Sequence, residues 1–572
     1  MDSLKSKIIL KKENFIQKKI YLEEHIIEAN SLSIDDLIET NDKFVRNEII
    51  RILNKISDTN KDLIKGVKIY ENFNFWSLTN FEEKNLYKKN NFYSIAKIIS
   101  LSFFLKNQEF DSIEIFDKNM NLTKFLKKKF PDTKIIFRKI PDKKIFMKND
   151  IFIFHEIYSL LKSFIFIIKK FFSKKSIDLK FKEDKNLFLS FFTYLDDENL
   201  KKNIYKSSYW GNLSLITNCN FLHFFLKSEK FPNIKKTQNA ISRLKDKNTH
   251  ALFDNFCSIN VIKKMIIFLF KIKLESFKIK KRLKVNYENL DISDLFYEDI
   301  KREFLTFNIL IKLYFFFTFE NFFRKFKFKK NCFFNAENQP WEKSLIYHWK
   351  NNNNNKIFGV INSLVRFWDL RYSKNRFHAN KILANGTFSY DNLKNFGYKN
   401  EELELVESLR YENSIQLKEI NRSKNILVLF DYSASSNDRM IKILNSIKSI
   451  NKFKIFVKFH TLGKIKKNLL KIDYQNYSKD IQNYEFVMCS NKTTASVDFY
   501  RKGYKIMIIR DTNEFNLSPL KNFEDCIFVS SSDEIDHYLN SNDKFKGLEH
   551  KYDKFYLINK ELLNWKKFLN DK

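Results

Sequence analysis

Short apolar runs bounded by polar residues recur along this chain and alternate with stretches of helical period. In the first two thirds such runs lie at 112–116, 133–137, 187–193, 221–225, 332–336 and 357–361. Runs of this length, rich in β-branched and aromatic residues, predict buried strands. The segments between them predict helices, several of them long, basic and aromatic.

The last third of the chain alternates more regularly. Strands are predicted at 425–430, 453–459, 485–489, 505–509 and 526–530, with helices at 438–450 and 494–501. Before them, a change of composition around Gly386 and Gly397 and an acidic stretch at 401–419, expected as a helix, indicate a junction. Alternation of this kind is typical of parallel sheets covered by helices. The sequence therefore predicts an α/β fold of two Rossmann-like domains facing a cleft, with helical insertions in the first.

The length fits two domains, because 572 residues exceed what one hydrophobic core usually serves. We place an N-terminal α/β domain with helical insertions at 1–375, a C-terminal Rossmann-like domain at 376–548 and a C-terminal helix at 549–572. The 8 glycines and 5 prolines leave few residues for tight turns, which favours a helix-rich chain.

The chain is strongly basic, with 103 Lys and Arg against 68 Asp and Glu and a formal net charge of +35. Basic residues flank aromatic, helix-like stretches near 169–175, 271–281 and 324–330. Two interpretations stay open: helices packed on a core with a solvated face, or amphipathic helices at an anionic membrane surface. No zinc-finger spacing, RNP-type strand or heptad-linked basic region accompanies the charge, so no nucleic acid partner is expected.

Neither a membrane span nor a leader is expected. The longest apolar runs, at 151–168, 207–226 and 304–319, are interrupted by polar residues, and the first residues contain no apolar leader. The five cysteines are scattered and odd in number, which argues against a disulfide framework and a zinc cluster. We expect a cytoplasmic protein, either free or peripheral on the inner face of the cell membrane.

Candidate chemistry begins where the run 332–336 ends. Glu337 and Gln339 follow this predicted strand, and Pro340 suits the first turn of a helix. Because ligands bind beyond the carboxyl ends of strands in open parallel sheets, Glu337 and Gln339 are candidate site residues. The structural alternative is that Glu337 caps the helix and Trp341 is an ordinary core residue.

Polar segments also follow three predicted strands of the second domain. They contain Ser433 and Ser435, then Lys458 and His460, then Ser490, Asn491, Lys492, Thr493 and Thr494. Hydroxyl and N–H groups that open a helix, with lysines nearby, can bind an anion. The sequence therefore predicts a diphosphate or nucleotide site here; the structural alternative makes Ser490 an N-cap and His460 a packed strand-end residue.

Several enzyme classes lack their motifs in this chain. The glycines are too widely spaced for G-x-G-x-x-G or a Walker A loop, which disfavours nicotinamide oxidoreductases and P-loop ATPases. H-E-x-x-H and G-x-S-x-G are absent as well. Asp196, Asp197 and Glu198 superficially resemble an acidic metal-binding pair but fit a turn that caps a helix better. No metal ion and no other cofactor is expected.

Segments 75–78, 83–85, 193–196, 208–211, 221–223, 337–342 and 366–372 together resemble the bacterial surface carbohydrate biosynthesis protein family, over residues about 70 to 510. That family is similar to GT-B glycosyltransferases, in which two Rossmann-like domains clasp a nucleotide sugar. Segments 458–460 and 490–496 also resemble the donor motifs of capsule and sialic-acid type transferases. The resemblance implies a glycosyltransferase of surface polysaccharide biosynthesis, of the capsule or O-antigen type.

The implied reaction transfers a sugar, without a metal, from a nucleotide sugar on the second domain to a glycan or lipid-linked acceptor on the first. Lys458, His460, Lys492 and the N–H groups near Thr493 and Thr494 are expected to stabilise the departing phosphate. Ser433, Ser435, Ser490 and Asn491 complete the expected donor site.

The acceptor side is expected on the first domain. Glu337 is the expected general base, with Glu342 in reserve. Arg366, Asp369 and Arg371, together with Gln339, are expected to orient the acceptor or close the cleft, although Arg366 and Asp369 fit an internal ion pair equally well.

Two other functions stay open. One is a non-catalytic membrane-surface scaffold or glycan-binding subunit of the same machinery, and the other is transfer of a polyol phosphate. A shared fold does not separate them from a glycosyltransferase.

Overall fold

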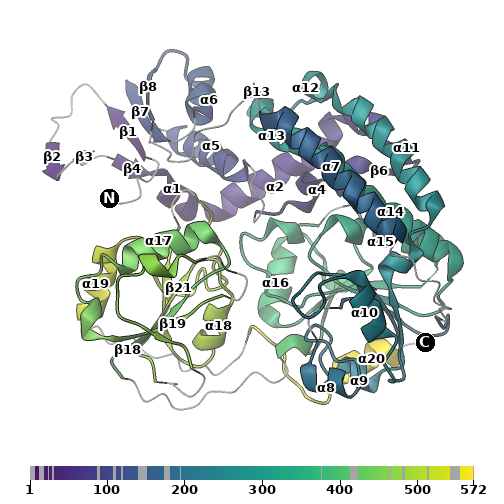
Figure 1. Cartoon of the computed structure of the whole chain (residues 1–572). Helices are drawn as coiled ribbons and strands as arrows, with labels where there is room; N and C mark the ends of the chain where they lie inside the picture. Colours follow the sequence, from purple (N-terminus) through teal and green to yellow (C-terminus); the bar gives the residue numbers. More distant parts are fainter. Residues whose placement is uncertain are drawn as a thin grey trace.

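The computed structural model describes residues 7–11, 19–22, 25–28, 31–86, 91–106, 108, 111–117, 120–139, 151–172, 181–192, 195–353, 355–374, 376–411, 423–460, 463, 465–478, 483–511, 514–541 and 554–570. Thr193 and Tyr194 lie outside these residues, as do 549–553 and 571–572 of the predicted C-terminal helix. Figure 1 shows two sheet domains side by side and a layer of helices above one of them.

The first sheet has seven strands among the described residues, all parallel, in the order β11-β10-β9-β14-β15-β16-β17. They are β9 (Leu187–Phe191), β10 (Asn220–Phe224), β11 (Thr249–Leu252), β14 (Cys332–Asn335), β15 (Ile357–Val360), β16 (Lys381–Ala384) and β17 (Leu403–Leu405). Numbered along the chain, the order is 3-2-1-4-5-6-7, so the winding reverses between β9 and β14.

Both faces of this sheet are buried, which explains its uninterrupted apolar runs. Leu187 and Cys332 lie in one core cluster, whereas Phe188 and Phe333 lie in another. The strands predicted near 187, 221, 332 and 357 are confirmed.

The edge of the first sheet corrects two predictions. A junction at 375–376 falls between β15 and β16 of one continuous sheet, so the strands place it after Leu405. The helix predicted at 401–419 is wrong in its described part, because the chain forms a 3-10 turn, η4 (Asn400–Glu402), and then β17. Leu403 is buried, whereas Glu404 pairs with Lys381 at 3.0 Å. This two-residue alternation outweighs the acidic composition.

The second sheet has six strands in the described chain, again all parallel, in the order β20-β19-β18-β21-β22-β23. They are β18 (Asn425–Leu429), β19 (Lys454–Lys458), β20 (Gln475–Asn476), β21 (Phe486–Ser490), β22 (Lys505–Ile509) and β23 (Ile527–Val529). Along the chain this order is 3-2-1-4-5-6, with the reversal between β18 and β21. These two strand orders confirm the predicted fold of two Rossmann-like domains.

In the part of the second domain that the structure describes, the strands are accompanied by the α-helices α17 (Ala434–Leu444), α18 (Ala495–Tyr500) and α19 (Ser532–Asn540). Helix α17 begins four residues before the predicted 438, because Ser433 caps it and accepts the N–H of Ser436.

The βαβ unit predicted at 112–137 forms as β7 (Ser112–Asp117), α6 (Asn121–Lys129) and β8 (Lys134–Lys139). It belongs to a separate sheet of order β4-β1-β7-β8, with β1 (Lys7–Lys11) and β4 (Ser31–Ser33). Helix α1 (Ile34–Thr40) follows β4 and lies between this small sheet and the second domain (Figure 1).

The helical insertions pack around α14 (Thr306–Lys325), which buries apolar side chains around most of its circumference, as expected for a core helix. Its partners are α7 (Ile151–Phe172), α11 (Ile259–Ser276), α13 (Ser293–Glu303) and α15 (Pro340–Asn352). Besides α6, the described residues outside the second domain also form the longer helices α2 (Asp42–Thr59), α5 (Phe92–Leu105), α10 (Ile234–Ile241), α16 (Thr387–Asn395) and α20 (Leu563–Asn570). Among the described residues, every helix is too short or too polar to cross a membrane.

Helix α20 returns to the first sheet. The ring centroid of Trp565 lies 6.1 Å from that of Phe333 and 6.5 Å from that of Trp210. Helix α20 therefore completes the core of the first domain, whereas Phe555 and Tyr556 before it lie in a core cluster of the second.

Candidate functional site

The turn after β14 is held by a buried carboxylate. Glu342, on the first turn of α15, accepts the N–H of Glu337 at 2.9 Å and that of Asn338 at 3.0 Å. Burial raises the pKa of the Glu342 carboxyl well above its ordinary value. Both oxygens are occupied and the side chain is buried, so this geometry makes Glu342 a positioning residue and corrects its expected role as a reserve base.

The same turn joins two segments that are far apart in the sequence. Asn338, at a φ of 57°, donates to the carbonyl oxygens of Glu82 at 3.0 Å and Glu83 at 3.2 Å. Next to Glu342, the ammonium of Lys343 is buried without a hydrogen-bond partner, and burial lowers its pKa to about 8. Segments 83–85 and 337–342 are both part of the family resemblance. They contact each other through buried polar groups next to Glu337.

Glu337 itself is accessible, with 34% of its side chain exposed. Gln339 donates to it at 2.8 Å, and a guanidinium nitrogen of Arg371 lies 3.9 Å away. Arg371 in turn makes two hydrogen bonds of 2.7 Å to the buried carboxylate of Asp369. The structure therefore brings together Glu337, Gln339, Asp369 and Arg371, four of the candidate residues.

Arg366 connects the two domains. Its guanidinium donates to the carbonyl oxygen of Lys492 at 2.9 Å and to that of Leu517 at 2.8 Å. Asp369 forms its ion pair with Arg371, so the predicted alternative of an Arg366–Asp369 ion pair is wrong. Arg366 contacts the second domain instead. The loop after β15 therefore touches the loop after β21, and the carboxyl ends of the two sheets face each other.

In the second domain, the loops after β18 and β21 are joined around Asp431. This buried carboxylate accepts the Ser490 hydroxyl at 2.8 Å and the N–H of Ser433 at 3.1 Å. The hydroxyls of Ser433 and Ser435 lie 3.0 Å apart on the exposed side. These loops meet at the point where the strand order reverses, which is where open α/β sheets bind ligands.

Lys492 is already neutralised by the protein. Its ammonium pairs with Asp511 at 3.3 Å and with Glu514, and donates to Ser436 at 3.1 Å. Burial by itself lowers the pKa of Lys492, but Asp511 and Glu514 raise it by more, so the net pKa lies above the ordinary value. The charge of Lys492 is therefore compensated by Asp511 and Glu514. The sequence-based expectation that Lys492 binds a phosphate does not fit this arrangement.

Lys458 and His460 lie at the end of β19, on the other side of β18. The Lys458 ammonium sits 4.8 Å from the centre of the Tyr477 ring, and the His460 ring lies 6.0 Å from that of Tyr432. Thr493 accepts the N–H of Ala495 at 3.3 Å and so shapes the loop before α18. Thr494 is the N-cap residue of α18 and makes no side-chain cap bond.

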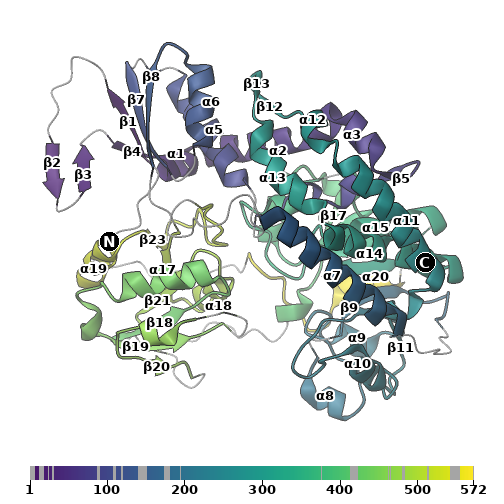
Figure 2. The same ribbon diagram turned by 45° about the horizontal axis from the view of Figure 1, so that its top comes forward.

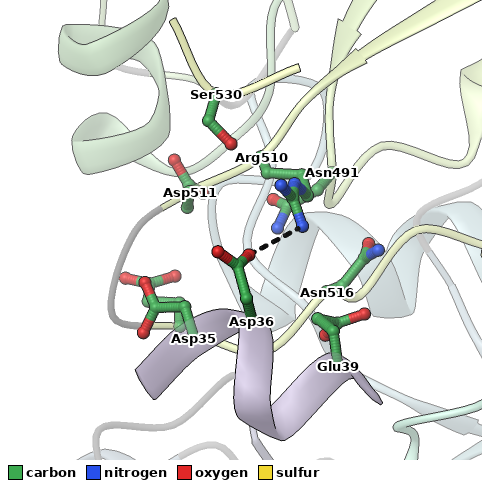
Figure 3. A pocket seen from close by; sticks show the side chains of 9 residues that line it. Asp35, Asp36, Glu39, Asn491, Arg510, Asp511, Asn516 and Ser530 are labelled. Atoms are coloured by element: carbon green, nitrogen blue, oxygen red, sulfur yellow. Dashed lines mark ion pairs between the residues drawn. The ribbon is translucent and has the colours of Figure 1, made fainter. Parts of the chain in front are cut away.

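A pocket opens at the carboxyl ends of β21, β22 and β23, where Asn491, Arg510 and Ser530 follow the strands (Figure 3). The Oδ1 atom of Asn491 and the Nε atom of Arg510 are buried without hydrogen-bond partners. The remaining lining residues are Asp35, Asp36, Glu39, Asp511, Glu514 and Asn516. Five carboxylates and one guanidinium therefore line this pocket, which makes it acidic.

Sequence reasoning missed Arg510 and the contribution of α1. Arg510 could have been found, since it directly follows the predicted strand 505–509. Asp35, Asp36 and Glu39 of α1 could not, because their approach depends on long-range packing. Figure 3 shows Asp36 pointing at Arg510, and the two side chains lie 3.7 Å apart.

A second polar chain lies within the first sheet. His223 Nε2 is 2.9 Å from His250 Nδ1, and His250 Nε2 is 2.9 Å from Asp246. Burial, and then the neighbouring His250, lowers the pKa of His223 well below its ordinary value. The ring is enclosed by Phe192, Tyr205 and Phe221, which makes His223 a packed core histidine.

No protein-family model matches this chain, and no curated protein matches its sequence. Among solved structures, the chain is similar to TarM, with 11% identity over 68% of this chain and 99% of that one at a TM-score of 0.35. It is similar to HepE of Anabaena, solved with UDP and glucose, with 8% identity, coverage of 62% and 89%, and a TM-score of 0.30. It is also similar to a UDP-N-acetylglucosamine 2-epimerase from Rickettsia bellii, with 10% identity, coverage of 62% and 86%, and a TM-score of 0.31. The fold class rests on the two strand orders described above.

Proposed function

We propose that this protein is a glycosyltransferase that moves a sugar from a nucleotide donor to a glycan or lipid-linked acceptor. The observation that carries the proposal is the position of the polar clusters. In the first sheet they follow β14, which flanks the reversal of strand order, and its neighbour β15. In the second sheet they follow β18 and β21, which flank the reversal, and β19 beside β18; Arg366 connects the β15 and β21 loops across the domains. A donor on one sheet and an acceptor on the other would then meet in one cleft.

In this proposal Glu337 removes the proton of the acceptor hydroxyl. It is exposed at the strand end, while Gln339 and Arg371 fix its orientation. The donor's phosphates lie against the second domain, near Ser433, Ser435, Lys458 and His460. The proposed reaction uses no metal ion, and the motif resemblance supports surface polysaccharide biosynthesis as its pathway.

Lys458 tests the donor site, because it is exposed at the carboxyl end of β19. Lys442 is a matched control. It is also exposed, but it lies on the last turn of α17, towards the amino ends of the strands. We expect one of CMP, UDP, GDP or CDP to raise the melting temperature of the wild type. At tenfold above its Kd, a nucleotide stabilises the folded state by about 1.4 kcal/mol.

The Lys458→Ala variant should lose most of this shift, whereas Lys442→Ala should keep it. A thermal-shift titration of both variants against the four nucleotides makes the measurement. Absence of a shift with every nucleotide at millimolar concentration would refute the nucleotide donor.

The acidic pocket favours a second candidate, a non-catalytic glycan-binding subunit. Carboxylates and the amides of Asn491 and Asn516 can accept and donate hydrogen bonds to sugar hydroxyls, whereas five carboxylates repel a phosphate. Saturation-transfer NMR with neutral sugars in the absence of nucleotide would detect such binding. A sugar that binds while no nucleotide does would favour this candidate.

A further inference from the structure

Helix α7 exposes large apolar side chains along its outer face. Phe154 is 68% exposed, and Phe164 is 66% exposed. The others are Ile153, Ile157, Tyr158, Leu160, Leu161, Ile165, Ile168 and Phe171. Their spacing of three and four residues places them on a continuous stripe over the length of the helix.

The polarity of α7 is inverted relative to that of an ordinary surface helix. The residues it buries include two serines, Ser159 and Ser163, at 4% and 5% exposure. Ser159 accepts the N–H of Phe307 on α14 at 2.6 Å, and Ser163 donates to the carbonyl oxygen of Ser159 at 2.7 Å. A helix packed on a core with a solvated polar face would show the opposite distribution. Of the two interpretations left open by the sequence, the first therefore fails for α7.

Helix α11 continues the apolar stripe. Its exposed residues are Ile259, Ile266, Ile267, Phe270 and Leu274, followed by Phe277, which is 76% exposed. Both α7 and α11 pack on α14, and Lys273 of α11 pairs with Glu156 of α7 at 2.7 Å. Figures 1 and 2 show α7 at the front of the helical layer and α11 at its edge. We call these exposed residues of α7, α11 and Phe277 the α7–α11 face.

Lysines border this face. Exposed members are Lys162, Lys169, Lys263, Lys271, Lys278 and Lys281. Lys162 lies 4.3 Å above the Tyr158 ring, so its ammonium stands at the edge of the apolar stripe. Apolar side chains flanked by lysines suit the boundary between the headgroups and acyl chains of an anionic membrane.

The charge distribution decides between a membrane and a second copy of the chain. Two copies packed through the α7–α11 face would bring their lysine borders together, and like charges repel at a desolvated interface. A negatively charged lipid surface instead complements these lysines and the net charge of +35.

We propose that the α7–α11 face docks the protein on the surface of an anionic phospholipid bilayer. The apolar stripe enters the interfacial layer and the lysines meet the lipid phosphates, without any helix crossing the membrane. This inference goes beyond the proposed function and does not depend on it, because it places no requirement on the cleft.

Vesicle flotation of the full chain tests the proposal. We expect binding to phosphatidylcholine vesicles that contain phosphatidylglycerol, and at least tenfold weaker binding to phosphatidylcholine alone. The double variant Leu161→Glu, Phe164→Glu should reduce binding to the anionic vesicles at least tenfold. Its control, Ile216→Glu with Leu469→Glu, adds the same charge at exposed apolar positions outside the face and should bind like the wild type.

The melting temperature and the far-UV circular dichroism of both double variants show whether each is folded. Equal losses in the two variants, or no vesicle binding by the wild type, would overturn the proposal. So would a wild-type dimer in light scattering that the Leu161→Glu, Phe164→Glu variant converts to a monomer, because the face would then join two copies of the chain.

Discussion

Two glutamates five residues apart carry the same chemistry in opposite surroundings. Glu337 is accessible at the end of β14, whereas Glu342 is buried and holds the turn that presents Glu337. A sequence shows both as candidate bases, because carboxylates of one type look alike. Burial and hydrogen bonds divide the roles: one side chain can meet a substrate, and the other cannot.

Exchange of each glutamate for glutamine separates these roles. Glu337→Gln should lower turnover of the nucleotide sugar at least about 100-fold, the usual loss for a missing general base, with an unchanged melting temperature. Glu342→Gln should instead lower the free energy of unfolding by about 1–3 kcal/mol, because an amide NH2 then faces a main-chain N–H. Turnover assays and chemical denaturation make the two measurements. Full turnover by Glu337→Gln would remove it as the base, and unchanged stability of Glu342→Gln would mean that the turn needs no carboxylate.

Helix α1 is the element that closes the pocket of the second domain. Its Asp36 faces Arg510, and its Glu39, together with Asp42 at the start of α2, pairs with Lys521 at 2.6 and 2.8 Å. A helix from the start of the chain thus places negative charge at the ends of β21, β22 and β23, beside the β18 loop where the proposed donor binds. Its acidic residues compete with an anionic ligand for Arg510.

Removal of one of these charges should strengthen nucleotide binding. With Asp36→Asn, we expect the Kd of the stabilising nucleotide to fall about fivefold, since one charge a few ångströms away in a partly solvated site contributes about 1 kcal/mol. Asp62→Asn, an exposed change on α3 (Lys61–Gly66), is the control and should leave the Kd unchanged. Isothermal titration calorimetry at low salt measures both. An unchanged Kd for Asp36→Asn would place the nucleotide away from Arg510.

At the scale of the whole molecule, a small joint holds the two domains together. Arg366 donates to two carbonyl oxygens of the second domain, and beside it the rings of Trp368 and Phe515 lie 4.6 Å apart. Tyr93 of α5 packs on the same Phe515 at 5.0 Å. Three parts of the chain therefore meet at one buried point next to the proposed cleft.

Loss of Arg366 should loosen this joint. Arg366→Met leaves the carbonyl oxygens of Lys492 and Leu517 without their donor, at a cost of about 1–3 kcal/mol for each buried group. We expect the second domain to unfold at a lower temperature than the first, as a separate transition in differential scanning calorimetry. The exposed change Arg376→Met should keep the wild-type trace. A wild-type trace for Arg366→Met as well would mean that the aromatic contacts alone couple the domains.

Much of the architecture followed from local pattern. Buried parallel strands such as β14, β18 and β21 are unbroken apolar runs, so their positions were predictable to within a residue or two. Strand β17 was not predicted, because three residues at the edge of a sheet show too little alternation of apolar and polar residues. The two-residue strand β20 was not predicted for the same reason.

The candidate site divides in the same way. The sequence by itself determined that polar residues follow the strands and that both sheets are parallel, because these properties depend on neighbours in the chain. Only the tertiary structure decided that Lys492 is neutralised by Asp511 and Glu514, that Glu342 is buried, that α1 lines the pocket, and that α7 turns its apolar side outward. Charge compensation and burial depend on contacts between segments that are far apart in the sequence. A local sequence pattern does not specify those contacts.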